Sequence, residues 1–249
     1  MKQEIRISAV TYLNTKPFVY GIENSGYLKN YRLELDIPSV CAAKLRNDEA
    51  DIGLVPVAVI PGFKEYRILT DYCIGAVGAV RSVMLFGDVG MGQIKKVYLD
   101  YHSETSVLLA RILAARYWKI NPEWLQGKQG FEKNIVGTTA GVVIGDRALN
   151  LCGKFQYSYD LAEEWYRFTS LPFVFACWVA NKPLPGDFID AFAKAIEFGV
   201  KHKEEAVTTL GLISKGLSAK DYVNNCISYE LDAQKQNGME LFLKYAGKF

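Results

Sequence analysis

The chain has 249 residues, half of them apolar and 13% aromatic, a composition that excludes an intrinsically disordered protein. Its 29 basic and 27 acidic residues leave a net charge of only +2, so bulk charge gives no indication of nucleic-acid binding. The longest uncharged run, residues 168–181, is 14 residues long, shorter than the roughly 20 that cross a bilayer, so no membrane association is expected.

Strand and helix signals alternate in the first third of the chain. A β-branched run predicts a strand at 5–12, followed by a helix that starts near Asn14 and stops at Gly26. A short helix capped by Ser39 is expected next. The accompanying strands are predicted at 31–37, 51–59, 67–80 and 82–86. This alternation predicts a parallel sheet with right-handed crossovers.

The alternation restarts after Phe86. Strands are predicted at 96–100, 141–144 and 171–179, with helices at 102–118, 147–151, 161–166 and 188–202. The last fifty residues are expected to be helical, with breaks at Gly211 and Gly216. We therefore predict an α/β protein of two lobes joined by two crossovers. Residues 1–85 with 185–249 would form the first lobe, and residues 90–180 the second.

The turns between strands and helices are the candidate ligand sites, because ligands of open α/β sheets bind at the carboxyl ends of the strands. In the first turn, residues 11–18, Asn14 either caps the helix or offers its amide to a ligand. In the second, Pro56 ends a buried strand and either lines a cleft or is structural.

Two later turns carry polar groups as well. Ser103, Thr105 and Ser106 place three hydroxyls and several backbone N–H groups at one helix start, which suits a carboxylate or a phosphate. The alternative is a capping box between Ser103 and Ser106, with Thr105 exposed. The fourth turn holds Gly145 and Asp146, and a helix cap is the favoured role for Asp146.

Several common sites have no sequence support. GxGxxG, Walker A and HExxH motifs are absent, and His102 has no acidic partner at the spacing of a catalytic triad. No metal site is predicted. The five cysteines are odd in number and form no CxxC, so we expect buried thiols. The N-terminal residues lack a signal-peptide pattern, which predicts a cytoplasmic protein.

Seven segments, in this order, resemble the MqnA chorismate dehydratases of menaquinone biosynthesis by the futalosine pathway. One departure is Ser170, where that family usually has glycine before Leu-Pro-Phe. The matching segments are 12–18 (YLNTKPF), 51–56 (DIGLVP), 81–85 (RSVML), 99–100 with 103–106 (LD and SETS), 144–149 (IGDRAL), 160–165 (DLAEEW) and 171–178 (LPFVFACW).

The resemblance implies a two-lobed fold similar to the type II periplasmic binding proteins, with a ligand cleft between the lobes. It implies a hydro-lyase that converts chorismate to 3-[(1-carboxyvinyl)oxy]benzoate without a metal or organic cofactor. Asn14 and Ser82 fall on the catalytic positions. The substrate-binding positions would be Tyr12, Leu13, Thr15, Pro56, Ser103, Thr105, Ser106, Gly145, Asp146 and Phe173.

Neither Asn14 nor Ser82 is a good base at neutral pH. We therefore hypothesise that the enolpyruvyl carboxylate of the substrate takes the C3 proton, while these two residues orient it and the leaving hydroxyl. Two alternatives remain: an enzyme similar to 1,4-dihydroxy-6-naphthoate synthase, or a non-catalytic solute-binding protein. The first should lack residues 12–17 as they stand here, and the second should carry a secretion signal or a lipid-anchor cysteine.

Overall fold

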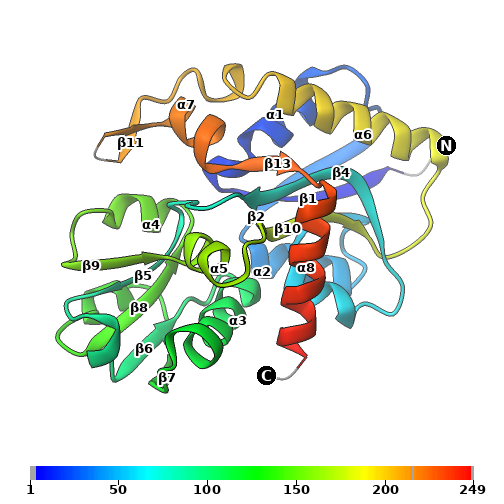
Figure 1. Cartoon of the computed structure of the whole chain (residues 1–249). Helices are drawn as coiled ribbons and strands as arrows, with labels where there is room; N and C mark the ends of the chain where they lie inside the picture. Colours follow the sequence, from blue (N-terminus) through cyan, green and yellow to red (C-terminus); the bar gives the residue numbers. More distant parts are fainter. Residues whose placement is uncertain (1–3, 215, 248–249) are drawn as a thin grey trace.

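The structure, a computed structural model, describes residues 4–214 and 216–247. It contains two main β-sheets that lie side by side, each with its own helices (Figure 1). We call the larger sheet and its helices the first lobe, and the smaller sheet and its helices the second lobe. Within the described ranges, no helix is both long and apolar enough to cross a membrane.

The first sheet has six strands, and only part of it is parallel. β1 lies between β2 and β3 and runs parallel to both, as the alternation predicted. β10 is antiparallel to its neighbours β3 and β4. The strand order is β13 (Ser228–Glu230), β4 (Arg67–Ala76), β10 (Phe173–Ala180), β3 (Ile52–Pro56), β1 (Ile5–Val10) and β2 (Tyr31–Asp36).

Helices α1 (Lys16–Asn24) and α6 (Gly186–Lys201) pack closely against each other over the first sheet (Figure 1). A Cβ atom on Gly21 would lie 2.0 Å from the carbonyl oxygen of Ala195, and one on Gly199 would lie 1.9 Å from that of Pro17. The two glycines therefore allow the helix backbones to touch. This lobe also holds α2 (Pro38–Arg46) and α8 (Ala233–Ala246).

The second sheet has five strands and is mixed. β6 is parallel to β7 and β8, whereas β5 is antiparallel to β8 and β9. The order is β7 (Glu123–Gln126), β6 (Lys96–Leu99), β8 (Thr139–Ile144), β5 (Val83–Gly87) and β9 (Tyr157–Asp160). Its helices are α3 (Glu104–Leu113), which continues as a π turn to Trp118, α4 (Asp146–Leu151) and α5 (Leu161–Thr169).

The strand pairing corrects the predicted lobe boundaries at two places. β5 belongs to the second sheet, although residues 82–85 were assigned to the first lobe. β10 is inserted into the first sheet, although residues 173–180 were assigned to the second. Both strands are buried along their whole length, so their patterns identify a strand without indicating its partners. The crossovers are therefore residues 77–82 and 170–172.

The sequence predicted a helical C-terminal part, and this prediction is wrong for several of its segments. This part contains the hairpin strands β11 (Leu212–Ser214) and β12 (Leu217–Ser218), a single helical turn α7 (Ala219–Asp221), a π turn at Tyr222–Cys226 and β13. These elements are too short to show a period of their own. β13 is a strand because it pairs with β4, which is far away in sequence.

Candidate functional site

A cavity of about 50 Å³ lies between the two lobes. This volume is well below the roughly 300 Å³ of a small-molecule site, so a ligand of ordinary size would fit only if the lobes moved apart. Its lining comes from the first lobe (Val10, Tyr12, Asn14, Thr15, Pro38, Leu54, Pro56, Ile74, Phe175 and Ala176), the first crossover and its exit (Val80, Ser82 and Val83) and the second lobe (Ser103, Ser106, Ile144 and Gly145).

A larger hollow of about 510 Å³ lies elsewhere on the first lobe, near Ile5 and the start of α6. It contains none of the predicted site residues. It also lies at the amino end of β1, whereas ligands of such sheets bind at the carboxyl ends. We therefore take the smaller cavity, where the carboxyl ends of β1, β3 and β8 meet, as the candidate site.

Asn14 lies in a 3-10 turn, Leu13–Thr15, after β1. One interpretation of the sequence made it the cap of α1, but it does not cap that helix. Its side-chain Oδ1 accepts a hydrogen bond from the Thr15 hydroxyl at 3.2 Å. Its backbone oxygen accepts one from the Tyr229 hydroxyl at 3.0 Å. The Nδ2 hydrogens and the second lone pair of Oδ1 are the parts of the Asn14 amide that are available to a ligand.

Ser82 lies at the end of the first crossover and is only 1% exposed. Its hydroxyl oxygen accepts a hydrogen bond from the Tyr222 hydroxyl at 2.7 Å. Its backbone oxygen accepts one from the Gly145 N–H at 2.8 Å. The structure thus brings Asn14 and Ser82 to one cavity, with Tyr222 as a partner that the sequence did not reveal.

The start of α3 contributes two hydroxyls to the same cavity. Ser103 caps the helix, accepting from the Ser106 N–H at 3.5 Å and from its hydroxyl at 3.4 Å. Thr105 is neither exposed nor part of the lining, because its buried Oγ1 accepts from the Ala58 N–H at 3.1 Å. Thr105 therefore does not face this cavity and links the two lobes instead, while its contact with substrate stays a prediction.

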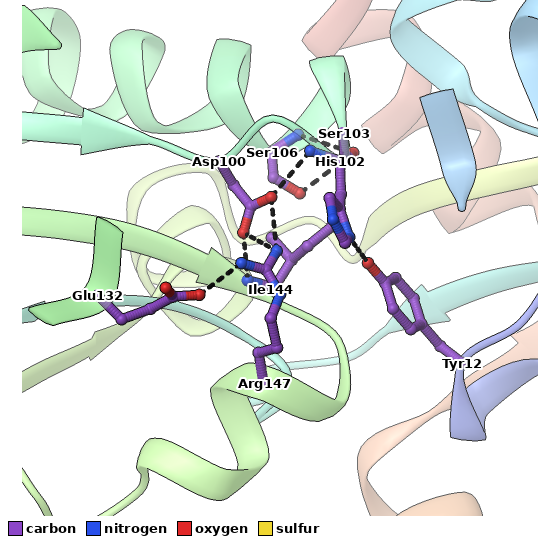
Figure 2. Close-up of polar contacts among 8 residues, drawn as sticks. All are labelled: Tyr12, Asp100, His102, Ser103, Ser106, Glu132, Ile144 and Arg147. Carbon is purple, nitrogen blue, oxygen red and sulfur yellow. Dashed lines mark hydrogen bonds and ion pairs between the residues drawn. The ribbon is translucent and has the colours of Figure 1, made fainter. Parts of the chain in front are cut away.

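Tyr12 reaches across the cleft from the first lobe, and its hydroxyl shares a hydrogen bond with Nδ1 of His102 (Figure 2). Burial raises the pKa of Tyr12 well above its usual range. Burial and the nearby Arg147 charge lower the pKa of His102. Both side chains are therefore neutral near pH 7, and we call this contact the Tyr12–His102 bridge.

A partly buried ion pair supports the second-lobe side of the site (Figure 2). Asp100 accepts from the backbone N–H groups of His102 at 2.8 Å and Ile144 at 3.0 Å. Arg147 binds both oxygens of Asp100, at 2.6 and 2.8 Å, and Glu132 at 2.6 Å. This network fixes the ends of β6 and β8. Asp100 and Arg147 lie in two of the segments that carry the family resemblance, but they were not predicted as site residues.

Asp146 and Leu13 were predicted to bind substrate, but they bind each other. The Leu13 N–H donates to Oδ1 of Asp146 at 3.2 Å, which adds a second link between the lobes. Burial raises the pKa of Asp146. The cap of α4 is Gly145, not Asp146. Neither Leu13 nor Asp146 is among the residues that line the cavity.

Phe173 was predicted to line the site, but Phe175 does so. The Phe173 ring packs in the aromatic core, 5.5 Å from Trp165 and 5.1 Å from Phe242 between ring centroids. β10 has a register shift between Val174 and Ala176, which interrupts the regular alternation of its two faces. No signal in the sequence marks this irregularity.

The lining offers hydrogen-bond donors and apolar walls but few titratable groups. Among the described residues that line it, none is Asp, Glu, His, Lys, Arg or Cys. The Tyr12 phenol, with its raised pKa, is not a base at neutral pH. Among the residues that the structure describes, no three His, Cys, Asp or Glu side chains are grouped to hold a metal ion. The site can therefore orient a bound molecule and hydrogen-bond to its oxygens.

Comparisons with known proteins show the family of the chain. A family model described as "Menaquinone biosynthesis" matches residues 5–248. The chorismate dehydratase of Thermus thermophilus is 24% identical, with 95% of this chain and 93% of that protein aligned.

Solved structures show a similar fold. Protein AF1704 of Archaeoglobus fulgidus has a TM-score of 0.74 at 13% identity, over 99% of this chain and 98% of that one. The Candida albicans CA3427 product, described as having the periplasmic binding protein fold, has a TM-score of 0.65 at 15% identity, over 99% and 90%. The alkanesulfonate-binding protein SsuA of Xanthomonas axonopodis pv. citri, bound to MOPS, has a TM-score of 0.62 at 13% identity. The match covers 97% of this chain and 93% of that one. The predicted two-lobed binding-protein fold is confirmed.

Proposed function

The chain belongs to the menaquinone biosynthesis family, and from this membership we propose that it is a chorismate dehydratase. It would remove water from chorismate and form 3-[(1-carboxyvinyl)oxy]benzoate. The observation that carries the proposal is that Asn14 and Ser82, the residues matched to catalytic positions, line one cavity with the start of α3. The relative from Thermus thermophilus supports the same reaction.

The lining suits a dicarboxylate with a hydrophobic ring. The hydroxyls of Ser103 and Ser106, at the positive end of α3, would receive one carboxylate. Leu54, Ile74 and Phe175 would enclose the ring and exclude water, which strengthens the polar contacts. No cofactor is required, because the ring becomes aromatic when water is lost.

The chemical step would break two bonds of the substrate. The C3–H bond breaks and its proton passes to the enolpyruvyl carboxylate, which acts as the base. The C4–O bond breaks and hydroxide leaves, with a hydrogen bond from the Asn14 amide or the Ser82 hydroxyl that stabilises its developing charge. The proton and the hydroxide together make the water that is lost. A lining without a side-chain base supports this scheme.

The test is to incubate the purified chain with chorismate and follow the benzoate product by liquid chromatography and mass spectrometry. We expect turnover by the wild type and a fall in kcat on the order of a hundredfold for Asn14→Ala or Ser82→Ala. Asn134→Ala, an exposed asparagine in the second lobe, is the matched control and should retain full activity.

The same assay separates the alternatives. Chorismate binding without any product would favour a non-catalytic solute-binding protein, which the likeness to SsuA makes the second candidate. Neither binding nor turnover would favour an activity like that of the dihydroxynaphthoate synthase. Either result would overturn the proposed function.

A further inference from the structure

Ser82 and Tyr222 form an isolated pair of hydroxyls at the wall of the cavity. Both residues are 1% exposed, and their oxygens are 2.7 Å apart. Burial raises the pKa of Tyr222 well above its usual range, so the phenol keeps its proton. In the part of the chain that the structure describes, neither hydroxyl has another hydrogen-bond partner.

Two hydroxyls that bond only to each other use one proton and leave the other without an acceptor. If Ser82 donated to Tyr222, the leftover proton would belong to a fully buried phenol, which is costly. If Tyr222 donates, the leftover proton belongs to Ser82, which lines the cavity and can meet an oxygen of a ligand there. The second arrangement is therefore the stable one.

The backbone around Ser82 is fixed independently of Tyr222. Arg81 has a left-handed φ of +62°, and its N–H donates to Asp160 at 2.6 Å. The Ser82 carbonyl is held by the Gly145 N–H. Only the direction of the Ser82 hydroxyl proton remains to be set, and Tyr222 is the group in position to set it.

We propose that Tyr222 is a positioning residue which, by donating to Ser82 Oγ, directs the Ser82 proton into the cavity as a donor to the substrate. This inference rests on the proposed function and adds a residue to it. A hydroxyl that accepts a hydrogen bond also becomes a stronger donor, so the effect should be greatest on the charge that develops in the transition state. Tyr222 itself does not line the cavity.

The test compares Tyr222→Phe with the wild type in chorismate turnover. The phenylalanine ring keeps the packing and removes the hydroxyl. We expect kcat to fall on the order of tenfold, equivalent to one hydrogen bond, with KM changed less than about twofold. Tyr31→Phe is the matched control, because it loses a hydrogen bond from a tyrosine hydroxyl to the Ile22 backbone oxygen, away from the cavity. This variant should turn over chorismate normally.

A double-variant experiment separates positioning from packing. In a Ser82→Ala background, Tyr222→Phe should cause no further loss, because the proton that it directs is already absent. An equal loss in both backgrounds, or wild-type kcat for Tyr222→Phe alone, would overturn the inference and leave the proposed function standing. Absence of turnover in the wild type would overturn both.

A second substitution applies if Tyr222→Phe does not fold. Incorporation of 3-fluorotyrosine at position 222 keeps the shape and makes the phenol a stronger donor. The kcat should then differ from wild type when Ser82 is present and match Ser82→Ala when it is not. An identical kcat with Ser82 present would count against the inference.

Discussion

Gly145 meets two requirements that other residues cannot meet together. Its φ of +64° and ψ of −148° lie in a region open essentially to glycine alone. A Cβ atom at this position would also lie 2.7 Å from the Tyr12 ring. Gly145 thus permits the close approach of Tyr12 on which the Tyr12–His102 bridge depends.

Gly145→Ala should therefore lower both stability and chorismate turnover. Backbone strain and the clash with Tyr12 together should cost about 3 kcal/mol in the free energy of unfolding. Urea unfolding and the turnover assay would measure the two effects. Gly137→Ala is the matched control, because Gly137 has a φ of +57° but no atom within 4 Å of the added methyl group. It should cost about 1 kcal/mol and leave turnover intact. Equal costs and equal turnover for the two variants would refute the role of the close approach.

Asp160 connects helix α5 of the second lobe to the first crossover. It caps α5 by accepting from the N–H groups of Ala162 and Glu163, and it also accepts from Arg81. Burial is the dominant influence and raises the pKa of its carboxyl to about 6, although these N–H groups oppose the shift. The protein thus holds a proton here that the unfolded chain would release near pH 4.

This shift predicts the direction of a pH effect on stability. Because the folded pKa is raised, the contribution of Asp160 is complete below about pH 4 and is lost as the pH rises to about 6. The loss should be about 3 kcal/mol relative to Asp160→Asn, which does not titrate. Urea unfolding of both proteins at pH 4, 5, 6 and 7 would measure it. If the free energies of unfolding of the two proteins changed in parallel with pH, the pKa of Asp160 would not be raised in the folded protein.

Local patterns predicted elements better than they predicted partners. α6 was expected at 188–202 and is found at Gly186–Lys201, because a long amphipathic helix carries its own period. The placement of β10 between β3 and β4 depends on hydrogen bonds to distant strands, which no local pattern records. The same reason explains which residues of the site were predicted and which were missed. Asn14, Ser103 and Ser106 were found from their turns, and Ser82 from the family resemblance. Tyr222 and the Asp100–Arg147 pair were missed, because they reach the site through contacts between segments that are far apart in the sequence.

At the scale of the whole molecule, a set of polar contacts joins the lobes across the cleft. They include the Tyr12–His102 bridge, the Leu13 N–H to Asp146, and the Ser39 N–H to the His102 oxygen at 3.1 Å. The cavity between them is smaller than chorismate, so binding of this proposed substrate would require some of these contacts to break and re-form. A contact that is absent from the open form and made in the closed, liganded form would contribute to substrate affinity.

Tyr12→Phe and His102→Phe should each weaken chorismate binding about fivefold, the effect of one hydrogen bond. The double variant should bind chorismate no more weakly than either single variant, because all three lose the same hydrogen bond.

His102→Asn should bind chorismate normally and keep most of its turnover, since the Oδ1 of asparagine can replace Nδ1 as a hydrogen-bond partner. Calorimetry and the turnover assay would measure both quantities. If His102→Asn binds normally but loses turnover, the imidazole is the base and the substrate is not.

The insertion of β10 also sets the order in which the chain can fold as it is made. All five strands of the second sheet lie between residues 83 and 160, so a ribosome releases that sheet complete. β3 and β4 emerge earlier, but the strand that joins them follows only at residues 173–180. Throughout the synthesis of the second lobe, β3, which is buried at every residue in the finished protein, has one edge without its neighbour. A pause in translation over this stretch therefore exposes an apolar strand edge, the kind of surface that chaperones cover and that aggregation begins from.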